Sequence, residues 1–243
     1  MCNFATKMAK DAFQFRQFVV HQDRCAMKVG TDGTLLGAWA DVPEEAVRLL
    51  DVGTGTGLIA LMLAQRFPGA SVTAIDIDPS AVEQASENVA ASPFASRIEV
   101  MAADICQFDT LQHFDAIVCN PPFFENALHC PDAQRAIARH TTQMTYWALM
   151  HAARRLLTEA GRLSVIIPDN FRSRMASEAA LQGLFLTRQF AVRTTPQKLP
   201  RRYLLEFRKT PVDVVVRADV VLETKPHERS TWYQSITQDF YIK

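Results

Sequence analysis

Three glycines alternate with two threonines in the segment Asp51-Val-Gly53-Thr-Gly55-Thr-Gly57. The apolar run before the segment predicts a buried strand, and the apolar residues after it predict a helix. Glycines in such a turn let the backbone approach a ligand closely and direct amide N–H groups toward it. The segment therefore predicts a nucleotide-type ligand at the end of a strand.

The acid at the head of this loop bears on which nucleotide is bound. Gly55-x-Gly57-x-x-Ala60 fits the dinucleotide form G-x-G-x-x-A, and Asp76 lies at the spacing of a ribose ligand. Asp51, however, would repel a pyrophosphate and suits a ligand with a cationic amine. S-adenosylmethionine carries an ammonium and a sulfonium and no phosphate, so it fits better. A nicotinamide-dependent oxidoreductase stays open as the alternative.

The tetrapeptide Asn120-Pro121-Pro122-Phe123 follows a second predicted strand. An amine on an aromatic ring is a poor nucleophile because its lone pair is delocalised. Two acceptors, here the Asn120 side-chain oxygen and the Pro121 carbonyl, favour a pyramidal nitrogen and stabilise the charge that develops on it. The prolines fix the backbone, and Phe123 offers a face on which a base can stack. The segment predicts methyl transfer to such a nitrogen.

The cysteine before this tetrapeptide offers a competing chemistry. A Cys119 thiolate could attack a pyrimidine ring, as in cytosine-C5 methylation. Because successive side chains of a strand point to opposite faces, Cys119 and Asn120 should not share the site. We therefore expect Cys119 to pack in the core.

The elements that position these residues alternate between strands and helices. This order predicts an α/β fold: a doubly wound, Rossmann-like, mostly parallel sheet of seven strands with an antiparallel edge strand. The whole chain, 1–243, is interpreted as one domain, in which residues 1–40 cap a catalytic core at 41–243. Strands are expected at 47–52, 71–76, 97–101, 115–119, 162–167, 186–193 and 203–209, with a further strand or a tail at 212–222. Helices are expected at 58–67, 79–91, 144–157 and 173–184.

Charge is distributed unevenly along a chain of 243 residues with 26 basic and 26 acidic side chains. Residues 135–210 hold fourteen Lys or Arg against four Asp or Glu, a net charge of +10. A basic cluster lies between 188 and 209, and such a cluster can bind phosphates or simply form a solvated surface. The five cysteines show no CxxC pair, and charged residues interrupt every apolar run. We expect a cytoplasmic protein without a metal or a membrane span.

On these motifs the sequence resembles the class I S-adenosylmethionine-dependent methyltransferases. The resemblance implies that the loop from Asp51 through Gly53, Gly55 and Gly57 surrounds the methionine part of the cofactor. It also implies that Asp76 binds the ribose and that Asp104, with Ile105, binds the adenine, while Asn120 borders the cofactor. Asp78 competes for the ribose role, but it precedes Pro79, where a helix N-cap is expected.

Three further stretches resemble the bacterial tRNA1(Val) adenine-N6 methyltransferases, which modify adenine 37 beside the anticodon. They are Phe13-x-Phe15-Arg16-Gln17-Phe18 with Met27 to Gly33, then Ala136 to His140, and Gln238-Asp239-Phe240-Tyr241. The resemblance implies that Lys28, Gly30, Thr31 and Asp32 fold over the cofactor. It also implies that Arg135, Arg139 and His140 face the RNA, and the basic cluster adds Lys198, Arg201 and Arg202.

The leading hypothesis is methyl transfer from S-adenosylmethionine to N6 of adenine 37 of tRNA1(Val), by a monomer that binds the anticodon loop. The tetrapeptide is also typical of rRNA guanine-N2 and protein glutamine methyltransferases, so these remain alternatives. A non-catalytic RNA-binding module is a further one.

Overall fold

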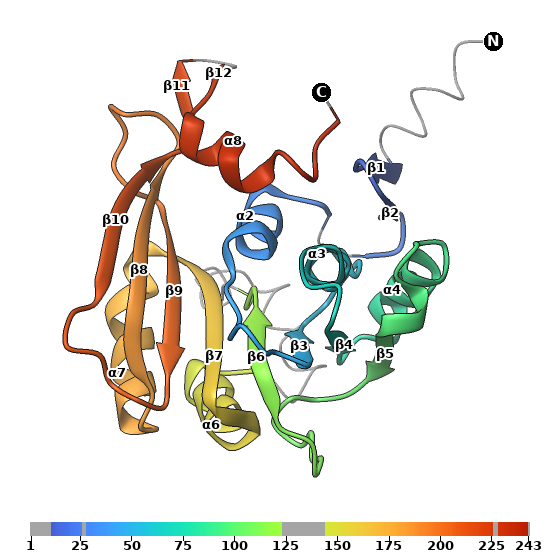
Figure 1. Cartoon of the computed structure of the whole chain (residues 1–243), viewed down its shortest axis with the longest axis horizontal. Helices are drawn as coiled ribbons and strands as arrows, with labels where there is room; N and C mark the ends of the chain where they lie inside the picture. The colour runs from blue at the N-terminus through green and yellow to red at the C-terminus, as the bar shows by residue number, and fades with distance from the viewer. Residues whose placement is uncertain (1–10, 26–27, 123–143, 226–227, 243) are drawn as a thin grey trace, which may run out of the picture.

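One eight-stranded sheet organises the computed structural model, which describes residues 11–25, 28–122, 144–225 and 228–242 (Figure 1). Its strand order is β10-β8-β9-β7-β6-β3-β4-β5. Neighbouring strands are parallel except at β9, which is antiparallel to both β7 and β8. The strands are β3 (Arg48–Val52), β4 (Ser71–Asp76), β5 (Ile98–Ala102), β6 (Phe114–Cys119), β7 (Leu157–Pro168), β8 (Phe185–Arg193), β9 (Arg202–Arg208) and β10 (Val216–Val221).

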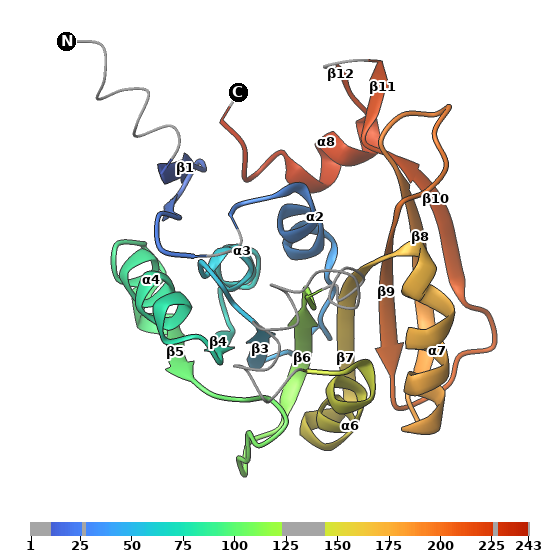
Figure 2. The same cartoon turned by 180° about the vertical axis from the view of Figure 1, so that it is seen from behind.

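Helices cover both faces of this sheet, because side chains of the central strands alternate between two cores. Ala116 and Val118 of β6 face one core, which includes α2 and α3, whereas Ile117 and Cys119 face the other, which includes α6 and α7. Helix α7 lies behind β8 and β9 in Figure 1 and in front of them in Figure 2. The helices are α2 (Thr31–Trp39), α3 (Leu58–Arg66), α4 (Pro79–Ala90), α6 (Tyr146–Leu156), α7 (Arg172–Leu181) and α8 (Thr231–Thr237), with short 3-10 turns at η1 (Ala95–Arg97) and η2 (Asp169–Phe171).

The predicted α/β, doubly wound class is confirmed, with two differences in the sheet. It has eight strands, because residues 216–221 add β10 in parallel beside β8. The two late strands pair antiparallel as expected, but the antiparallel strand itself, β9, lies inside the sheet. Sequence could not place it there, since strand order depends on long-range pairing.

Helix α2 was not predicted, although residues 31–39 lie in the expected N-terminal cap. Its residues from Thr34 to Trp39 are all buried, so the segment lacks the polar face by which an amphipathic helix is found. Helix α2 packs against α3, β7 and α8. This part of the cap therefore belongs to one of the two cores.

The first and the last described segments of the chain meet on the side of α2 and α3. The hairpin of β1 (Ala12–Gln14) and β2 (Val19–His21) turns at Arg16, whose backbone N–H donates to the Phe240 carbonyl at 2.8 Å. Phe15 stacks on Tyr241 with ring centroids 5.9 Å apart. The first and last of the three resembling stretches thus form one unit, and residues 231–241 pack on the core. A small ribbon of β11 (Glu223–Lys225) and β12 (Glu228–Arg229) precedes α8.

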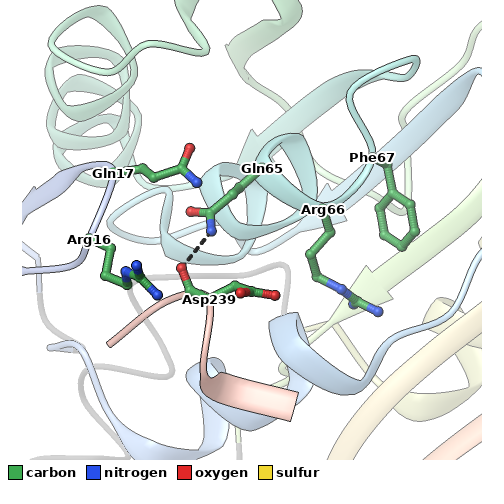
Figure 3. Close-up of a pocket in the computed structure, with 6 residues that line it drawn as sticks. All are labelled: Arg16, Gln17, Gln65, Arg66, Phe67 and Asp239. Atoms are coloured by element: carbon green, nitrogen blue, oxygen red, sulfur yellow. Dashed lines mark hydrogen bonds between the residues drawn. The ribbon is translucent and has the colours of Figure 1, made fainter. Parts of the chain in front are cut away.

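A pocket of about 680 Å³ lies at this junction (Figure 3). It is lined by Arg16, Gln17, Gln65, Arg66, Phe67 and Asp239. Nε2 of Gln65 donates to the Asp239 carbonyl at 2.8 Å. Because Gln65 is near the end of α3 and the glycine loop precedes its start, α3 separates this pocket from the loop.

Candidate functional site

The candidate site lies at the edge where the parallel strands end. The neighbouring strands β3, β4 and β6 finish at Val52, Asp76 and Cys119, and Val52 is paired with both Ile75 and Cys119. The glycine loop, the acid at the end of β4 and the Asn-Pro-Pro turn therefore leave adjacent strands at the same edge. This is where doubly wound sheets bind their ligands.

The glycine loop has the backbone geometry that its sequence predicts. Gly53, Gly55 and Gly57 have φ angles of 68°, 55° and 81°. These values lie in the left-handed region, which residues other than glycine rarely adopt. The N–H groups of Gly53 and Thr54 donate to the Ile75 carbonyl at 2.9 and 3.0 Å, which ties the loop to β4. A Cβ at Gly53 or Gly55 would meet no atom within 4 Å, so the space over these glycines is open.

Asp51 is fully buried at the base of this loop. Its Oδ2 accepts from Thr54 Oγ1 at 2.6 Å and from the Ala60 N–H at 3.1 Å. Its Oδ1 is buried with no hydrogen-bond partner among the described residues. Burial raises the pKa of Asp51 to about 7 against the lowering effect of these two donors. The site thus contains an acceptor that a cationic donor would satisfy.

The structure separates the two acids that compete for the ribose role. Asp76 ends β4, and its Oδ2 accepts from the Gly55 N–H at 2.9 Å, so it borders the glycine loop. Asp78 is the N-cap of α4, where Oδ1 accepts from the Ser80 N–H at 2.9 Å. Asp78 therefore caps a helix, whereas Asp76 is the acid that contacts the glycine loop, and its ribose role stays a prediction.

Asp104 and Ile105 follow β5, next to β4. The Ala103 N–H donates to the Asp76 carbonyl at 2.9 Å, which places this segment beside the end of β4. Oδ1 of Asp104 accepts from the Cys106 N–H at 2.9 Å, while Ile105 is buried in the core that includes α6 and α7. Asp104 is thus near Asp76, and Ile105 contributes packing.

Asn120, Pro121 and Pro122 follow β6 directly, and Phe123 lies outside the described residues. Cys119 is fully buried, and burial raises the pKa of its thiol well above the ordinary value. Its side chain packs in the core, as expected from strand alternation. A thiolate nucleophile at Cys119 is therefore not supported.

The segment from Lys28 to Asp32 reaches the glycine loop through α2. Lys28 is exposed, Gly30 is the N-cap of α2, and Thr31 and Asp32 form its first turn. A Cβ at Gly33 would lie 3.2 Å from Leu58, the first residue of α3 after the glycine loop. The structure thus brings the start of α2 close to the residue that follows the loop, while the placement of Lys28 to Asp32 over the cofactor stays a prediction.

Most of the basic cluster of 188–209 is held in ion pairs, which weakens the charge argument for RNA. Arg188 and Arg208 both pair with the buried Glu206, at 3.0 and 2.9 Å. The other paired members are Arg193 with Asp219, Arg202 with Asp32, and Lys209 with Glu159. Only Lys198 and Arg201 have no ion-pair partner among the described residues, and both are exposed in the β8–β9 loop. The expected RNA contacts Arg135, Arg139 and His140 lie outside those residues.

Thr54 was missed by sequence reasoning, although it is the first threonine of the glycine loop. Its hydroxyl donates to Asp51, so it helps to hold the buried carboxylate in place. Its position three residues after Asp51, in a turn, could have indicated this hydrogen bond. The Arg202–Asp32 pair joins residues 170 positions apart, and nothing in the sequence indicates it.

The described residues contain neither a helix long and apolar enough to cross a membrane nor a metal-binding group of three or more His, Cys, Asp or Glu.

Comparison with known proteins agrees with this geometry. Residues 35–197 match the family model described as methyltransferase small domain, a segment that runs from α2 to the β8–β9 loop. Among solved structures, a predicted O-methyltransferase from Agrobacterium tumefaciens has a TM-score of 0.63 at 21% identity, covering 86% of this chain and 96% of that one. The structural likeness concerns the fold. Together, fold and family model define the class as methyltransferases.

Relatives with longer matches are more specific. A protein of Phocaeicola vulgatus is 50% identical over 235 residues, covering 97% of this chain and 99% of that protein, and one of Bacteroides thetaiotaomicron is 44% identical over 236 residues with the same coverage. Both are named tRNA1(Val) (adenine(37)-N6)-methyltransferase. The chain belongs to this family.

Proposed function

We propose that the protein transfers a methyl group from S-adenosylmethionine to N6 of adenine 37 in tRNA1(Val). The observation that carries the proposal is the position of Asn120 and Pro121. They follow β6 directly beside the glycine loop, in a chain 50% identical to a relative named for this reaction. The nicotinamide alternative lacks support, because the family is one of methyltransferases.

The residues present fit S-adenosylmethionine. Oδ1 of Asp51 is a buried acceptor without a partner among the described residues, and it suits the cofactor's ammonium group. The open space over Gly53 and Gly55 admits a ligand against the backbone. Asp76 would accept from the ribose hydroxyls and Asp104 from the adenine amino group, while Lys28, Gly30, Thr31 and Asp32 would lie over the ligand. When bound, the cofactor supplies the electrophilic methyl group.

Asn120 and Pro121 act on the nitrogen that is methylated. The Asn120 side-chain oxygen and the Pro121 carbonyl accept from its two N–H bonds, which favours a pyramidal nitrogen and stabilises its developing positive charge. Pro122 has no N–H that would compete and helps to fix the turn. Phe123 is assigned the stacking contact with the base. The remaining catalytic effect comes from aligning donor and acceptor.

RNA binding is assigned to fewer residues than the sequence indicated. Lys198 and Arg201 are available for phosphates, and Arg135, Arg139 and His140 remain predicted contacts. Arg202 is reassigned to the α2 segment because of its pair with Asp32. Adenine 37 lies in a single-stranded loop, so its base can be turned outward at modest cost. We also propose a single-domain monomer that acts in the cytoplasm.

Nucleoside mass spectrometry of tRNA incubated with the protein and labelled S-adenosylmethionine tests this function. We expect label in N6-methyladenosine, and only when the tRNA carries adenine 37. Label in N2-methylguanosine would instead support guanine-N2 methylation. Label in protein glutamine, when cell protein is offered, would support protein glutamine methylation. RNA binding without any labelled product would favour a non-catalytic module.

A further inference from the structure

An exposed tryptophan lies on the first turn of α6. Helix α6 follows the connection that starts at Asn120, at the edge where β6 ends, and leads into the parallel strand β7. It must therefore begin near the edge that carries the candidate site and run away from it. Trp147 is its second residue. This places a large aromatic side chain near the edge of the sheet that carries the candidate site.

The exposure of Trp147 is unusual for this chain. All three tryptophans lie in described residues: Trp39 is 4% exposed, Trp232 is partly buried, and Trp147 is 49% exposed. Large apolar side chains left in water forgo the free energy of burial. Trp147 is therefore a candidate for contact with a ligand.

The indole of Trp147 is also held in place. Its ring stacks on the imidazole of His151, with centroids 5.0 Å apart and planes only 7° from parallel. His151 is in turn fixed by Gln182, whose Oε1 lies 3.1 Å from His151 Nδ1. An aromatic face that is ordered before binding loses little conformational entropy when a second ring stacks on it.

A guanidinium without a carboxylate partner among the described residues lies over the ring of Tyr146, the residue before Trp147. Arg174 is exposed in the first turn of α7, with its charge 5.8 Å from the ring centroid of Tyr146, the neighbour of Trp147. No ion pair to Arg174 is found in the part of the chain that the structure describes. Its neighbour Arg172 differs, since Asp169 lies 3.6 Å from it. The N-terminus of α7 adds further positive potential around Arg174.

We propose that Trp147 is a stacking platform for an unpaired base of the RNA next to the target adenine, and that Arg174 contacts an adjoining phosphate. The inference rests on the proposed RNA substrate. Aromatic rings combined with arginine are the chemistry by which proteins bind single-stranded nucleic acid, and the anticodon loop is single-stranded. Charge complementarity favours RNA over an apolar protein partner, which would leave Arg174 unpaired in an interface.

The test measures binding to a synthetic hairpin that carries the tRNA1(Val) anticodon loop, without S-adenosylmethionine. Stacking of a base on an exposed indole should quench tryptophan fluorescence in the wild type, and the Trp147→Phe variant should lose most of that quenching while still binding. Trp147→Ala should weaken binding by about 5- to 150-fold, the range measured for loss of one base stack. Arg174→Gln should reduce the slope of log affinity against log salt by about 0.7.

The matched control is Leu181→Ala, which removes another exposed apolar side chain at the far end of α7. It should leave both binding and quenching unchanged. Thermal unfolding of each variant separates loss of contact from loss of fold, and the phenylalanine variant retains a stacking ring in any case. Quenching that persists in Trp147→Phe, or unchanged affinity in folded Trp147→Ala, would overturn the proposal. So would a change in oligomeric state, which would make this surface an interface between copies.

Methylation of the same hairpin by the wild type is assayed in parallel. If the wild type methylates N6 but Trp147→Ala binds normally, only the stacking assignment fails. If the wild type leaves the hairpin and intact tRNA1(Val) unmethylated, the proposed function fails, and with it the substrate on which this inference rests.

Discussion

Asp32, in the first turn of α2, and Arg202, the first residue of β9, form an ion pair with Oδ2 and Nε 2.7 Å apart. The pair joins the segment assigned to the cofactor with the β8–β9 loop that carries Lys198 and Arg201. Both side chains are partly exposed, at 26% and 36%, so the pair should stabilise the fold by no more than about 1 kcal/mol. Its main effect is to position the first turn of α2.

Arg202→Gln is therefore expected to act on the cofactor more than on RNA. Release of the α2 turn should weaken S-adenosylhomocysteine binding about fivefold, as measured by calorimetry. The double variant Arg202→Gln/Asp32→Asn should bind little more weakly than Arg202→Gln alone, because both substitutions remove the same ion pair. The matched control is Arg201→Gln, because Arg201 has no ion-pair partner among the described residues. It should leave cofactor affinity unchanged and reduce the salt slope of RNA binding by about 0.7. If Arg202→Gln behaves like Arg201→Gln, Arg202 contacts RNA.

Asn120→Ala tests the assigned acceptor. Loss of one group that stabilises developing charge should lower kcat by about 10²- to 10³-fold, while affinity for S-adenosylhomocysteine should change by less than about threefold. Single-turnover methylation and calorimetry measure the two quantities. Cys119→Ala is the companion variant, and it should keep its activity because the thiol is buried and protonated. An inactive but folded Cys119→Ala would revive the thiolate mechanism.

The buried carboxylate of Asp51 predicts a pH dependence of both stability and binding. Its pKa is raised from the ordinary value to about 7 in the folded protein, so folding favours its protonated form. The free energy of unfolding should therefore fall as pH rises from about 4 to about 7 and then level off. A cationic ligand favours the ionised form, so S-adenosylhomocysteine affinity should increase over the same rise.

Calorimetry below pH 7 in buffers of different ionisation enthalpy should detect proton release on ligand binding. Asp51→Asn should remove this release, since it cannot titrate. Proton release that is unchanged in Asp51→Asn would show that another group titrates.

Glu206 is the buried centre of the basic cluster. It accepts from Thr187 Oγ1 at 2.8 Å and pairs with Arg188 and Arg208. Glu206→Gln keeps the shape but leaves Arg208 without a counter-charge among the described residues and leaves Arg188 with only the more distant Asp41, at 3.8 Å, so the free energy of unfolding should fall by about 2–4 kcal/mol. Urea denaturation measures the loss. Glu159→Gln, whose carboxylate is 84% exposed where it pairs with Lys209, should cost less than about 0.5 kcal/mol.

RNA affinity provides the second measurement for this cluster. If Arg188 and Arg208 are structural, Arg188→Gln should lower stability and leave the salt slope of RNA binding unchanged. A smaller salt slope of RNA binding in a folded Arg188→Gln variant would show that Arg188 contacts RNA.

The sequence predicted seven of the eight strands of the sheet, left residues 212–222 open as a strand or a tail, and predicted the edge at which Asp51, Asp76 and Asn120 lie. These features depend on local signals, namely apolar strands, glycines and the acids or amides at strand ends, and on the rule that parallel strands end together. The position of β9 inside the sheet and the Asp32–Arg202 pair depend on contacts between residues far apart in the chain, for which one sequence carries no signal. The basic cluster was overestimated for the same reason, because its acidic partners Asp32, Glu159 and Asp219 are distant in sequence.

Gly55→Ala and Gly57→Ala separate the backbone requirement of the loop from the space above it. Both residues have positive φ, so a side chain should cost about 1–2 kcal/mol of stability in either case. The two differ in what an added Cβ meets: open space at Gly55, and Ala85 of α4 at 3.4 Å at Gly57. If the open space is where the cofactor lies, Gly55→Ala should weaken S-adenosylhomocysteine binding beyond its effect on stability.

Thermal unfolding with and without S-adenosylhomocysteine measures both effects of these glycine variants. Gly69→Ala is the matched control, because Gly69 lies in the turn before β4 with no positive φ and no neighbour within 4 Å of its added Cβ. It should unfold at or slightly above the wild-type temperature, since alanine restricts the unfolded chain. Equal stabilisation of Gly55→Ala and Gly69→Ala by the ligand would place the cofactor away from this loop.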